Sequence, residues 1–406
     1  MDLTRRSWIA GAGLLQAAVA APAAQSALEL PLKAEFPVVK EEVCLNNGRW
    51  HPISAGGTRA IQKYLEFKAG GGGRDGDYSA RQQMLAKELF ARLIHATPAE
   101  VSFVGSTTVG ENLVVSGLGI PSGGGNVVTD ALHFEGSLYL YGELRKQGLD
   151  LRIVRPRDWR ISLDDMEKVI DRNTRLVAVS MVSMTNGFQH DLRPLCDLAH
   201  SRGALVYADV VQAAGAVPVD VRAAGIDFCA CASYKWLMGD MGLGFLYIRE
   251  GLLDRMRRSQ YGYRQLADVQ YHVFPYDPPG ESVMDWVPLK DAGGHFEVGT
   301  VANTTIACLT YSLQLIQDIG VEKIQAHRAP LLQRVQKELP RLGFEPMTPP
   351  ESTSPLATFA MKDTGQIAGK LRRAKVDVSV SPHRIRISPS VYNDQHDIDR
   401  LLECLS

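Results

Sequence analysis

The sequence predicts an α/β fold, with a large domain built on a mostly parallel seven-stranded sheet and a small α/β C-terminal domain. Two observations carry this prediction. Short apolar runs alternate with helical patterns over most of the chain, and the 406 residues are 45% hydrophobic, as in globular proteins. The formal net charge is −1, and the chain has no basic stripe that would favour nucleic acid as a partner.

The elements are predicted in the following order. A helix at 79–95 precedes the sheet strands, which are expected at 101–104, 126–129, 151–154, 176–180, 205–209, 228–232 and 244–248. A long helix from about Thr304 to Ile319 leads to small-domain strands near 357–361 and 376–380. We therefore divide the chain into an N-terminal segment that packs on the small domain (27–55), a large domain (56–303) and a small domain (304–406).

The first 26 residues are predicted to be a signal peptide. Arg5 and Arg6 precede an apolar stretch at 9–20 and then small residues at 21–24, which is typical of a twin-arginine signal. The apolar stretch is too short for a confident membrane span. We expect export in the folded state by the twin-arginine machinery, a periplasmic or secreted location and no stable membrane insertion. The alternative is a basic cytoplasmic N-terminus or a retained anchor.

Lys235 and Asp209 are the most informative pair in the chain. Lys235 follows the predicted strand 228–232, and Asp209 ends the predicted strand 205–209. This order indicates pyridoxal phosphate (PLP) chemistry, because a lysine amine condenses with the cofactor aldehyde and a carboxylate keeps the pyridine nitrogen protonated. The alternative is a surface lysine and an unrelated strand-end carboxylate.

A phosphate site is expected earlier, where the strand 101–104 leads into a helix. Gly105 allows close approach of the backbone, Ser106, Thr107 and Thr108 add hydroxyl donors, and a helix N-terminus attracts anions. The alternative is that these hydroxyl residues only cap the helix.

Four motifs occur together in one order. They are Ser233-Tyr234-Lys235-Trp236-Leu237, the glycine-rich run at 239–247, the run at 296–300 and the run at 386–393. With them, the chain from about residue 45 resembles the class V aminotransferase family, fold-type I PLP enzymes that include isopenicillin N epimerase-like proteins, kynureninase and cysteine desulfurases. The predicted signal adds a resemblance to a twin-arginine exported branch of that family.

The resemblance implies roles for individual residues. Lys235 would form the Schiff base, Asp209 would pair with the ring nitrogen, and Gln212 would lie near the ring oxygen. The residues implied in phosphate binding are Ser106 or Thr107 with Thr108, and also Ser233 and Tyr234, which could compensate for the absence of a hydroxyl at Ala232.

The same resemblance extends to the rest of the site. His133 and Phe134 both suit a ring stacked on the cofactor, and this choice stays open. Asn186 would reach the cofactor oxygen, unless it is only a turn residue, and Asn47 would lie near the substrate. Arg386 would anchor a substrate carboxylate, against the alternative of a solvent-exposed strand charge. Thr300 would reach the phosphate of a neighbouring subunit, which implies a homodimer with shared active sites.

We expect a PLP-dependent enzyme that acts on an amino acid or an amino-acid-bearing metabolite, with transamination as the preferred reaction. The alternatives are a lyase that performs C–S or other β-elimination, an epimerase, and a non-catalytic PLP-binding protein. The six cysteines form no C-x-x-C pair or zinc-like spacing, so no metal is expected. None lies between residues 309 and 402, which argues against a desulfurase that forms a protein persulfide. A Rossmann nucleotide site is disfavoured because the run around Gly242 lacks the third glycine.

Overall fold

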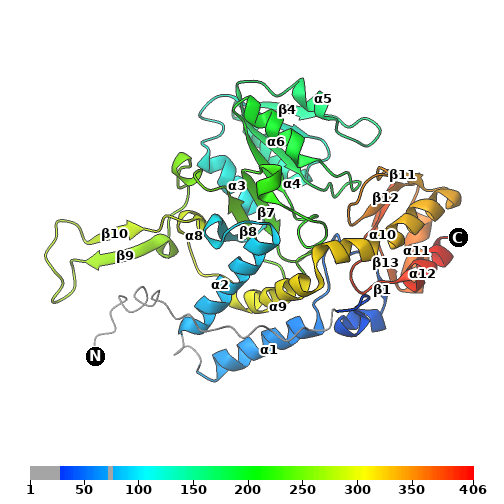
Figure 1. Ribbon diagram of the computed structural model, residues 1–406, viewed down its shortest axis with the longest axis horizontal. Coiled ribbons are helices and arrows are strands. Elements are labelled where there is room, and N and C mark those ends of the chain that lie inside the picture. Colours follow the sequence, from blue (N-terminus) through cyan, green and yellow to red (C-terminus); the bar gives the residue numbers. More distant parts are fainter. Residues whose placement is uncertain (1–27, 72–75) are drawn as a thin grey trace.

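The computed structural model describes residues 28–71 and 76–406 (Figure 1), so the predicted signal peptide at 1–26 lies outside the described residues. A seven-stranded sheet forms the centre of the large domain. Its strand order is β2 (Val101–Val104), β8 (Gly244–Ile248), β7 (Phe228–Ala232), β6 (Leu205–Asp209), β5 (Thr174–Ser180), β3 (Asn126–Asp130) and β4 (Asp150–Val154). β8 runs antiparallel to both neighbours, and the other adjacent pairs are parallel. The predicted fold class is confirmed.

Two helical layers cover the sheet, because successive strand residues point to opposite faces. Val206 and Ala208 pack in a core cluster with residues of α2 (Gly76–Leu93), α6 (Leu192–Ser201) and α9 (Asn303–Ile319). Leu205 and Tyr207 pack in a second cluster with residues of α3 (Thr107–Gly117) and α4 (Glu135–Lys146). Except for the edge strand β4 and Arg175 near the start of β5, every residue of these strands is buried, which explains the near-continuous apolar runs in the sequence.

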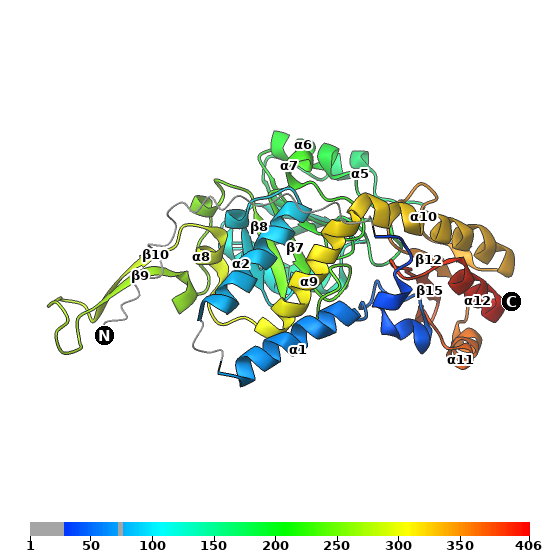
Figure 2. The same ribbon diagram turned by 60° about the horizontal axis from the view of Figure 1, so that its bottom comes forward.

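The small domain contains a four-stranded antiparallel sheet in the order β11 (Glu345–Pro346), β12 (Ala357–Ala360), β15 (Arg384–Ile387) and β14 (Ser379–Ser381). The helices α10 (Val321–Glu338), α11 (Gly365–Ala374) and α12 (Gln395–Leu405) accompany it (Figure 2). The prediction of one strand at 376–380 was wrong: β13 (Val376–Asp377) pairs with the N-terminal strand β1 (Val43–Cys44), whereas β14 pairs with β15. The segment 376–381 thus contributes strands to two different sheets.

The N-terminal segment joins the small domain through the parallel β1–β13 pair. α1 (Ala55–Ala69) then packs along α9 (Figure 2). The domain boundary proposed at residue 304 stays a prediction, although α9 contributes Ile306, Leu309 and Leu313 to the core of the large domain.

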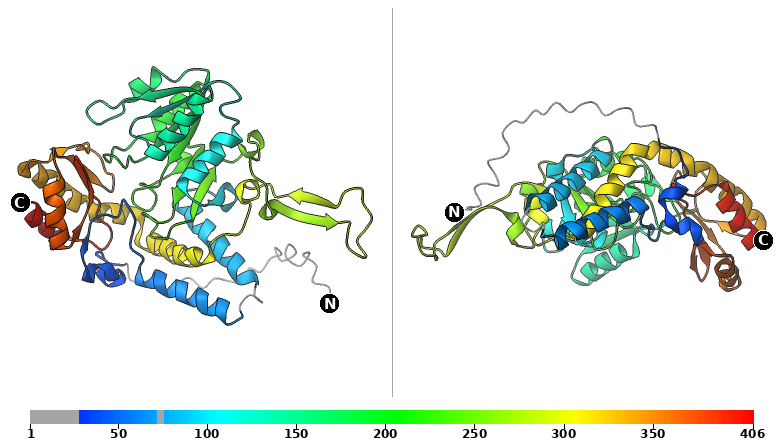
Figure 3. Two further views of the ribbon diagram at one scale, coloured as in Figure 1. Left: turned by 180° about the vertical axis from the view of Figure 1, so that it is seen from behind. Right: turned by 90° about the horizontal axis from the view of Figure 1, so that it is seen from below.

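A two-stranded hairpin of β9 (Leu266–Tyr271) and β10 (Met284–Pro288) projects from the large domain (Figure 3). The remaining α-helices of the described chain are the short α5 (Leu163–Glu167), α7 (Val221–Ala224) and α8 (Ala292–Phe296). Across the described residues, none of the helices combines the length and the apolar character needed to span a bilayer.

Candidate active site

Lys235 lies in the loop between β7 and β8, on a chain segment that is almost completely buried. Lys235 is only 7% exposed, and its Nζ lies 5.7 Å from the centroid of the Tyr234 ring. The loop is closed by hydrogen bonds from the Met238 and Gly239 N–H groups to the carbonyls of Lys235 and Ser233. Burial lowers the pKa of Lys235 to about 8; the nearby Arg386 also lowers it, and Asp209 opposes the shift. The amine is therefore far easier to deprotonate than that of a surface lysine.

Asp209 ends β6 at the carboxyl edge of the sheet and is 3% exposed. Its Oδ1 accepts a hydrogen bond from the Val211 N–H at 2.9 Å. Burial raises the pKa of this carboxyl, and the charges of His133 and Lys235 act against that increase. The structure thus places Asp209 within electrostatic reach of Lys235, as a PLP site requires.

The predicted phosphate turn connects β2 to α3. Ser106 is the N-cap, and its Oγ accepts from the Val109 N–H at 3.2 Å. The buried Thr107 hydroxyl accepts from the Ala232 N–H at 2.9 Å, which joins this turn to the end of β7, three residues before Lys235. Thr108 is exposed on the first turn. Its hydroxyl and the free N–H groups of the helix start are available to a phosphate.

Ser233 and Tyr234 differ in what they can offer a ligand. The Ser233 side chain is fully buried and donates its hydroxyl to the Asp240 carbonyl, so it closes the lysine loop instead of facing a phosphate. Its predicted cofactor contact is not supported. Tyr234 is half-buried, and its carbonyl accepts from the His51 N–H at 2.9 Å. Its ring stays beside the Lys235 amine.

Gln212 and Asn47 connect the N-terminal segment to the site. The Gln212 Nε2 donates to the Gly48 carbonyl, and its Oε1 accepts from the Trp236 indole, both at 2.8 Å. Asn47 donates to the Ser388 carbonyl at 2.8 Å and accepts from the Tyr392 hydroxyl at 2.6 Å. Since Asn47 is fully buried with both ends of its amide engaged, the structure gives it a role in joining chain segments and not the predicted substrate contact.

Arg386 lies on β15 of the small domain and is 9% exposed. Its Nη1 donates to the Met184 carbonyl at 2.9 Å, while its buried Nε has no hydrogen-bond partner. Burial, with smaller contributions from the charges of Arg384 and Arg49, lowers the pKa of Arg386 to about 10. A buried guanidinium with an unpartnered N–H favours the binding of an anion, and its charge acts on Lys235.

His133 and Phe134 occupy different environments. His133 is 2% exposed, with Nδ1 2.8 Å from the Ser180 Oγ and Nε2 3.2 Å from the Glu111 Oε1. Phe134 is half-buried at the N-cap of α4. Stacking needs an accessible ring face, and the half-buried Phe134 has more of its surface exposed than the buried His133; the choice between the two stays a prediction.

Asn186 is not brought into the site. It is fully buried, its Nδ2 donates to the carbonyls of Trp159 and Met347, and its Oδ1 accepts from the Phe188 N–H. These bonds use the amide to shape the loop after β5, so the structure does not support the predicted contact with a cofactor oxygen.

Thr300 is exposed and lines a cavity of about 320 Å³ together with Gly105 and Gly242. The residue therefore lies beside the phosphate turn of its own chain. Its predicted contact with a neighbouring subunit stays a prediction.

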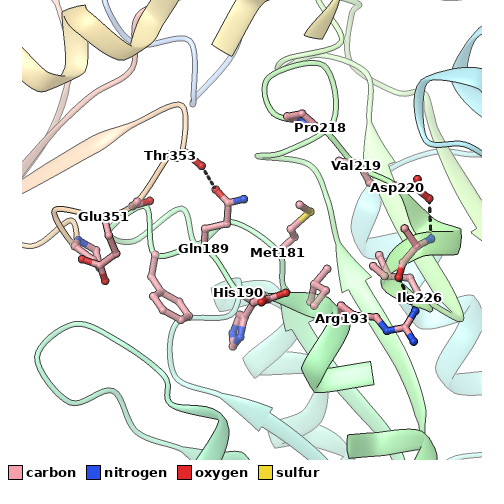
Figure 4. A pocket seen from close by; sticks show the side chains of 17 residues that line it. Met181, Gln189, His190, Arg193, Pro218, Val219, Asp220, Ile226, Glu351 and Thr353 are labelled. Carbon is pink, nitrogen blue, oxygen red and sulfur yellow. Dashed lines mark hydrogen bonds between the residues drawn. The ribbon is translucent and has the colours of Figure 1, made fainter. Parts of the chain in front are cut away.

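A second cavity, of about 600 Å³, lies between α6, α7 and the loop at 349–353 (Figure 4). None of the predicted site residues lines it. Its His190 is bonded to Asp130 at 3.0 Å, and Thr353 donates to Gln189 at 3.2 Å. These polar side chains are hydrogen-bonded to other protein groups, and the cavity is separate from the site around Lys235.

The residues that the structure does bring together fit PLP. The chain offers a buried amine with a lowered pKa on Lys235, a buried carboxylate on Asp209 and a hydroxyl-rich helix start at Thr107 and Thr108. The unpartnered Nε of Arg386 adds a place for a substrate carboxylate. These are the donors and acceptors that the aldehyde, ring nitrogen and phosphate of the cofactor need.

Sequence reasoning missed two contributors to the site. Glu111 is 1% exposed on α3 and bonds to His133, and Ser180 ends β5 beside Asp209. The acid at 111, inside the apolar pattern of a helix, was a signal that could have been noticed. The carbonyl of Met184 that holds Arg386 had no signal in the sequence, because any residue type provides one.

Comparisons with known proteins identify the family and the fold. The family model described as Aminotransferase class-V matches residues 58–401. A probable cysteine desulfurase from Methanothermobacter thermautotrophicus is 29% identical over 302 residues, covering 73% of this chain and 72% of that protein. The apo structure of a cysteine desulfurase from Thermococcus onnurineus NA1 matches with a TM-score of 0.83 at 23% identity, over 93% of this chain and 98% of the other.

A third similar protein is C-DES. A variant of it with glycine covalently linked to the PLP cofactor gives a TM-score of 0.83 at 20% identity, over 92% of this chain and 99% of the other. Another structure describes C-DES as a cystine C–S lyase in complex with its product, cysteine persulfide; its TM-score is 0.81 at 20% identity, over 91% and 98% of the two chains. At this identity the likeness shows the fold.

Proposed function

Because the chain belongs to the class V aminotransferase family, whose enzymes use PLP, we propose that it removes the Cα proton of an α-amino acid and completes a transamination. The substrate is a free amino acid or a metabolite that carries an α-amino acid group. The observation that carries the proposal is the pair of buried cations: a lysine with a lowered pKa and an arginine with an unpartnered Nε, which lowers that pKa further.

Each residue has a separate task. When bound, PLP supplies the electron-withdrawing ring that makes the Cα proton acidic. Lys235 takes that proton at Nζ, because its buried amine loses its own proton with a pKa of about 8. Asp209 presents a carboxylate to the ring nitrogen. Thr108 and the start of α3 hold the phosphate.

Arg386 orients the substrate. Its Nη1 is fixed by the Met184 carbonyl, which leaves Nε and further N–H groups for a carboxylate. A guanidinium binds a carboxylate with two parallel hydrogen bonds, so it holds one rotation of the substrate about its Cα. Because Arg386 lies on β15 of the small domain, its contact with the substrate carboxylate would connect the small domain to the cofactor site of the large domain.

A C–S lyase is the second candidate, favoured by the similarity to C-DES. The same proton removal by Lys235 would precede loss of a sulfur substituent from Cβ. A mechanism that stores sulfur on a cysteine in a small-domain loop is not supported, because no cysteine lies between residues 309 and 402 and the flanking Cys308 and Cys404 lie on the helices α9 and α12.

The test follows the absorption of the bound cofactor while a panel of amino acids is added, with keto acid and ammonia measured in parallel. Transamination predicts conversion to the pyridoxamine form, one keto acid per active site and no ammonia, with reversal by a second keto acid. Keto acid together with ammonia and an unchanged pyridoxal form would establish the lyase. Lys235→Ala should load cofactor without either reaction.

We also propose that the protein is an exported homodimer with shared active sites. Support comes from Arg5 and Arg6 before an apolar stretch and from the exposure of Thr300 beside the phosphate turn. Replacing both arginines by lysine should leave the protein in the cytoplasm, as cell fractionation would show. A mass of one chain by light scattering would contradict the dimer.

A further inference from the structure

A buried polar cluster lies behind the sheet edge that carries Asp209. Its centre is Glu111, which is 1% exposed and lies on α3, a helix whose Leu113 and Val115 belong to an apolar core cluster. The carboxylate accepts hydrogen bonds from Tyr141 at 2.8 Å and from Ser137, both on the adjacent α4 (Figure 1). A buried carboxylate of this kind needs a cation as well as donors to compensate for lost hydration.

His133 is that partner, and it reaches the active-site edge. Its Nε2 lies 3.2 Å from the Glu111 Oε1, and its Nδ1 lies 2.8 Å from the Ser180 Oγ. Ser180 ends β5 and is the direct register partner of Asp209 on β6. Both ring nitrogens therefore face oxygen atoms that can accept, which suits a doubly protonated imidazole.

The charges around His133 come from three elements. Glu111 faces it from α3, Asp209 from β6 and Asp130 from β3, where Asp130 also bonds to His190. The group bonded to its Nδ1, the Ser180 hydroxyl, is neutral, and so are the two hydroxyls that donate to Glu111, those of Ser137 and Tyr141. Burial works to lower the pKa of His133, but Glu111, by charge and hydrogen bond, and then Asp209 and Asp130 raise it.

The effect on Asp209 has the opposite sign. Burial raises the pKa of Asp209, and His133 is the strongest opposing influence, ahead of the Val211 N–H and Lys235. A positively charged imidazolium at His133 thus favours the ionised form of Asp209, whereas with a neutral imidazole the pKa of Asp209 stays raised by burial.

We propose that Glu111 and His133 are positioning residues for the reaction: Glu111 keeps His133 positively charged, and that charge keeps Asp209 ionised so that it can hold the proton on the cofactor ring nitrogen. This inference rests on the proposed function. Neither residue needs to touch the substrate, because they act through Asp209.

The charge of Glu111 distinguishes this role from a structural one. Glutamine has nearly the same size, its amide oxygen can accept from Tyr141, and its amide nitrogen can donate to the Ser137 hydroxyl. A purely structural cluster would therefore tolerate Glu111→Gln. A matched control is Tyr141→Phe, which removes one hydrogen bond to Glu111 and leaves both charges in place.

The experiment records ring nitrogen resonances of ¹⁵N-histidine-labelled protein against pH, with and without cofactor, and assigns His133 through a His133→Asn variant. We expect His133 to be protonated at neutral pH and its titration to move down by at least about one pH unit in Glu111→Gln, with a smaller change in Tyr141→Phe. With cofactor loaded, Glu111→Gln should also lower kcat roughly tenfold while KM stays within about twofold, and the pH dependence of the cofactor absorption should move with His133.

Two results would overturn the inference: a neutral His133 between about pH 6 and 8 in the unaltered protein, or a His133 titration that Glu111→Gln leaves unchanged. The first result decides the matter even if the variant does not fold. Failure of the unaltered protein to bind PLP would instead refute the proposed function. Normal loading with an unmoved His133 would refute this inference alone.

Discussion

Replacing Arg386 by lysine tests the substrate contact with little change in charge. The guanidinium uses Nη1 on the Met184 carbonyl and keeps its Nε and other N–H groups for a second partner. Lysine has one nitrogen on a flexible stem, so it can satisfy the carbonyl and one carboxylate oxygen but cannot supply two parallel bonds. The variant therefore loses about one charge-assisted hydrogen bond to the substrate.

Such a bond contributes about 2 kcal/mol, which corresponds to roughly a 30-fold loss in kcat/KM for α-amino acids. Arg386→Gln removes both bonds and should cost about 4 kcal/mol, or roughly a thousandfold. Steady-state kinetics with the best amino acid of the panel gives the ratio, and the matched control is Arg384→Lys, two residues earlier and half-buried, which should stay near the original activity. An Arg386→Lys variant within about threefold of the unaltered enzyme would refute a bidentate contact.

Three further predictions concern the loop, the turn and the N-terminal segment. Burial lowers the pKa of Lys235 to about 8, and the free amine is the form that reacts with PLP. The rate at which the cofactor-free protein captures PLP should therefore rise as the pH approaches that value and level off above it. Stopped-flow absorbance measures this rate, and a rate that does not change with pH would contradict the prediction. Thr107→Ala leaves the buried Ala232 N–H without its partner, so it should lower the free energy of unfolding by about 1–3 kcal/mol and weaken PLP binding, while Thr107→Ser should retain both in denaturant and cofactor titrations. Asn47→Ala should lower the free energy of unfolding by a similar amount of about 1–3 kcal/mol, because the Tyr392 hydroxyl and the Ser388 carbonyl lose their partner. A large rise in KM without a loss of stability would instead indicate that Asn47 contacts the substrate.

The strands of the large domain were predictable because buried parallel strands appear as short, continuous apolar runs. Strand 205–209 was placed with its observed bounds, and Asp209 followed at its carboxyl end. Lys235 was predictable for a different reason: a covalent role demands one residue type in a recognisable neighbourhood.

The contacts that the structure gives to Asn47, Asn186 and Ser233 could not be predicted from the sequence, for a common reason. Each has a polar side chain that a ligand could use, but its partner is a backbone group from a distant or looping segment, such as the Ser388 carbonyl for Asn47. The local sequence does not show whether a polar side chain bonds to a distant part of the chain or stays free for a ligand. Glu111 escaped notice because its meaning depends on His133, which meets it only when α3 and α4 pack together.

The central claim is that Lys235 binds PLP covalently. Reducing the loaded protein with borohydride, digesting it and locating the modified peptide by mass spectrometry tests this claim directly, because reduction makes the linkage between the lysine and the cofactor permanent. The account predicts a pyridoxyl group on Lys235 and none in Lys235→Ala. A label on another lysine, or none in protein that has been incubated with PLP, would contradict it.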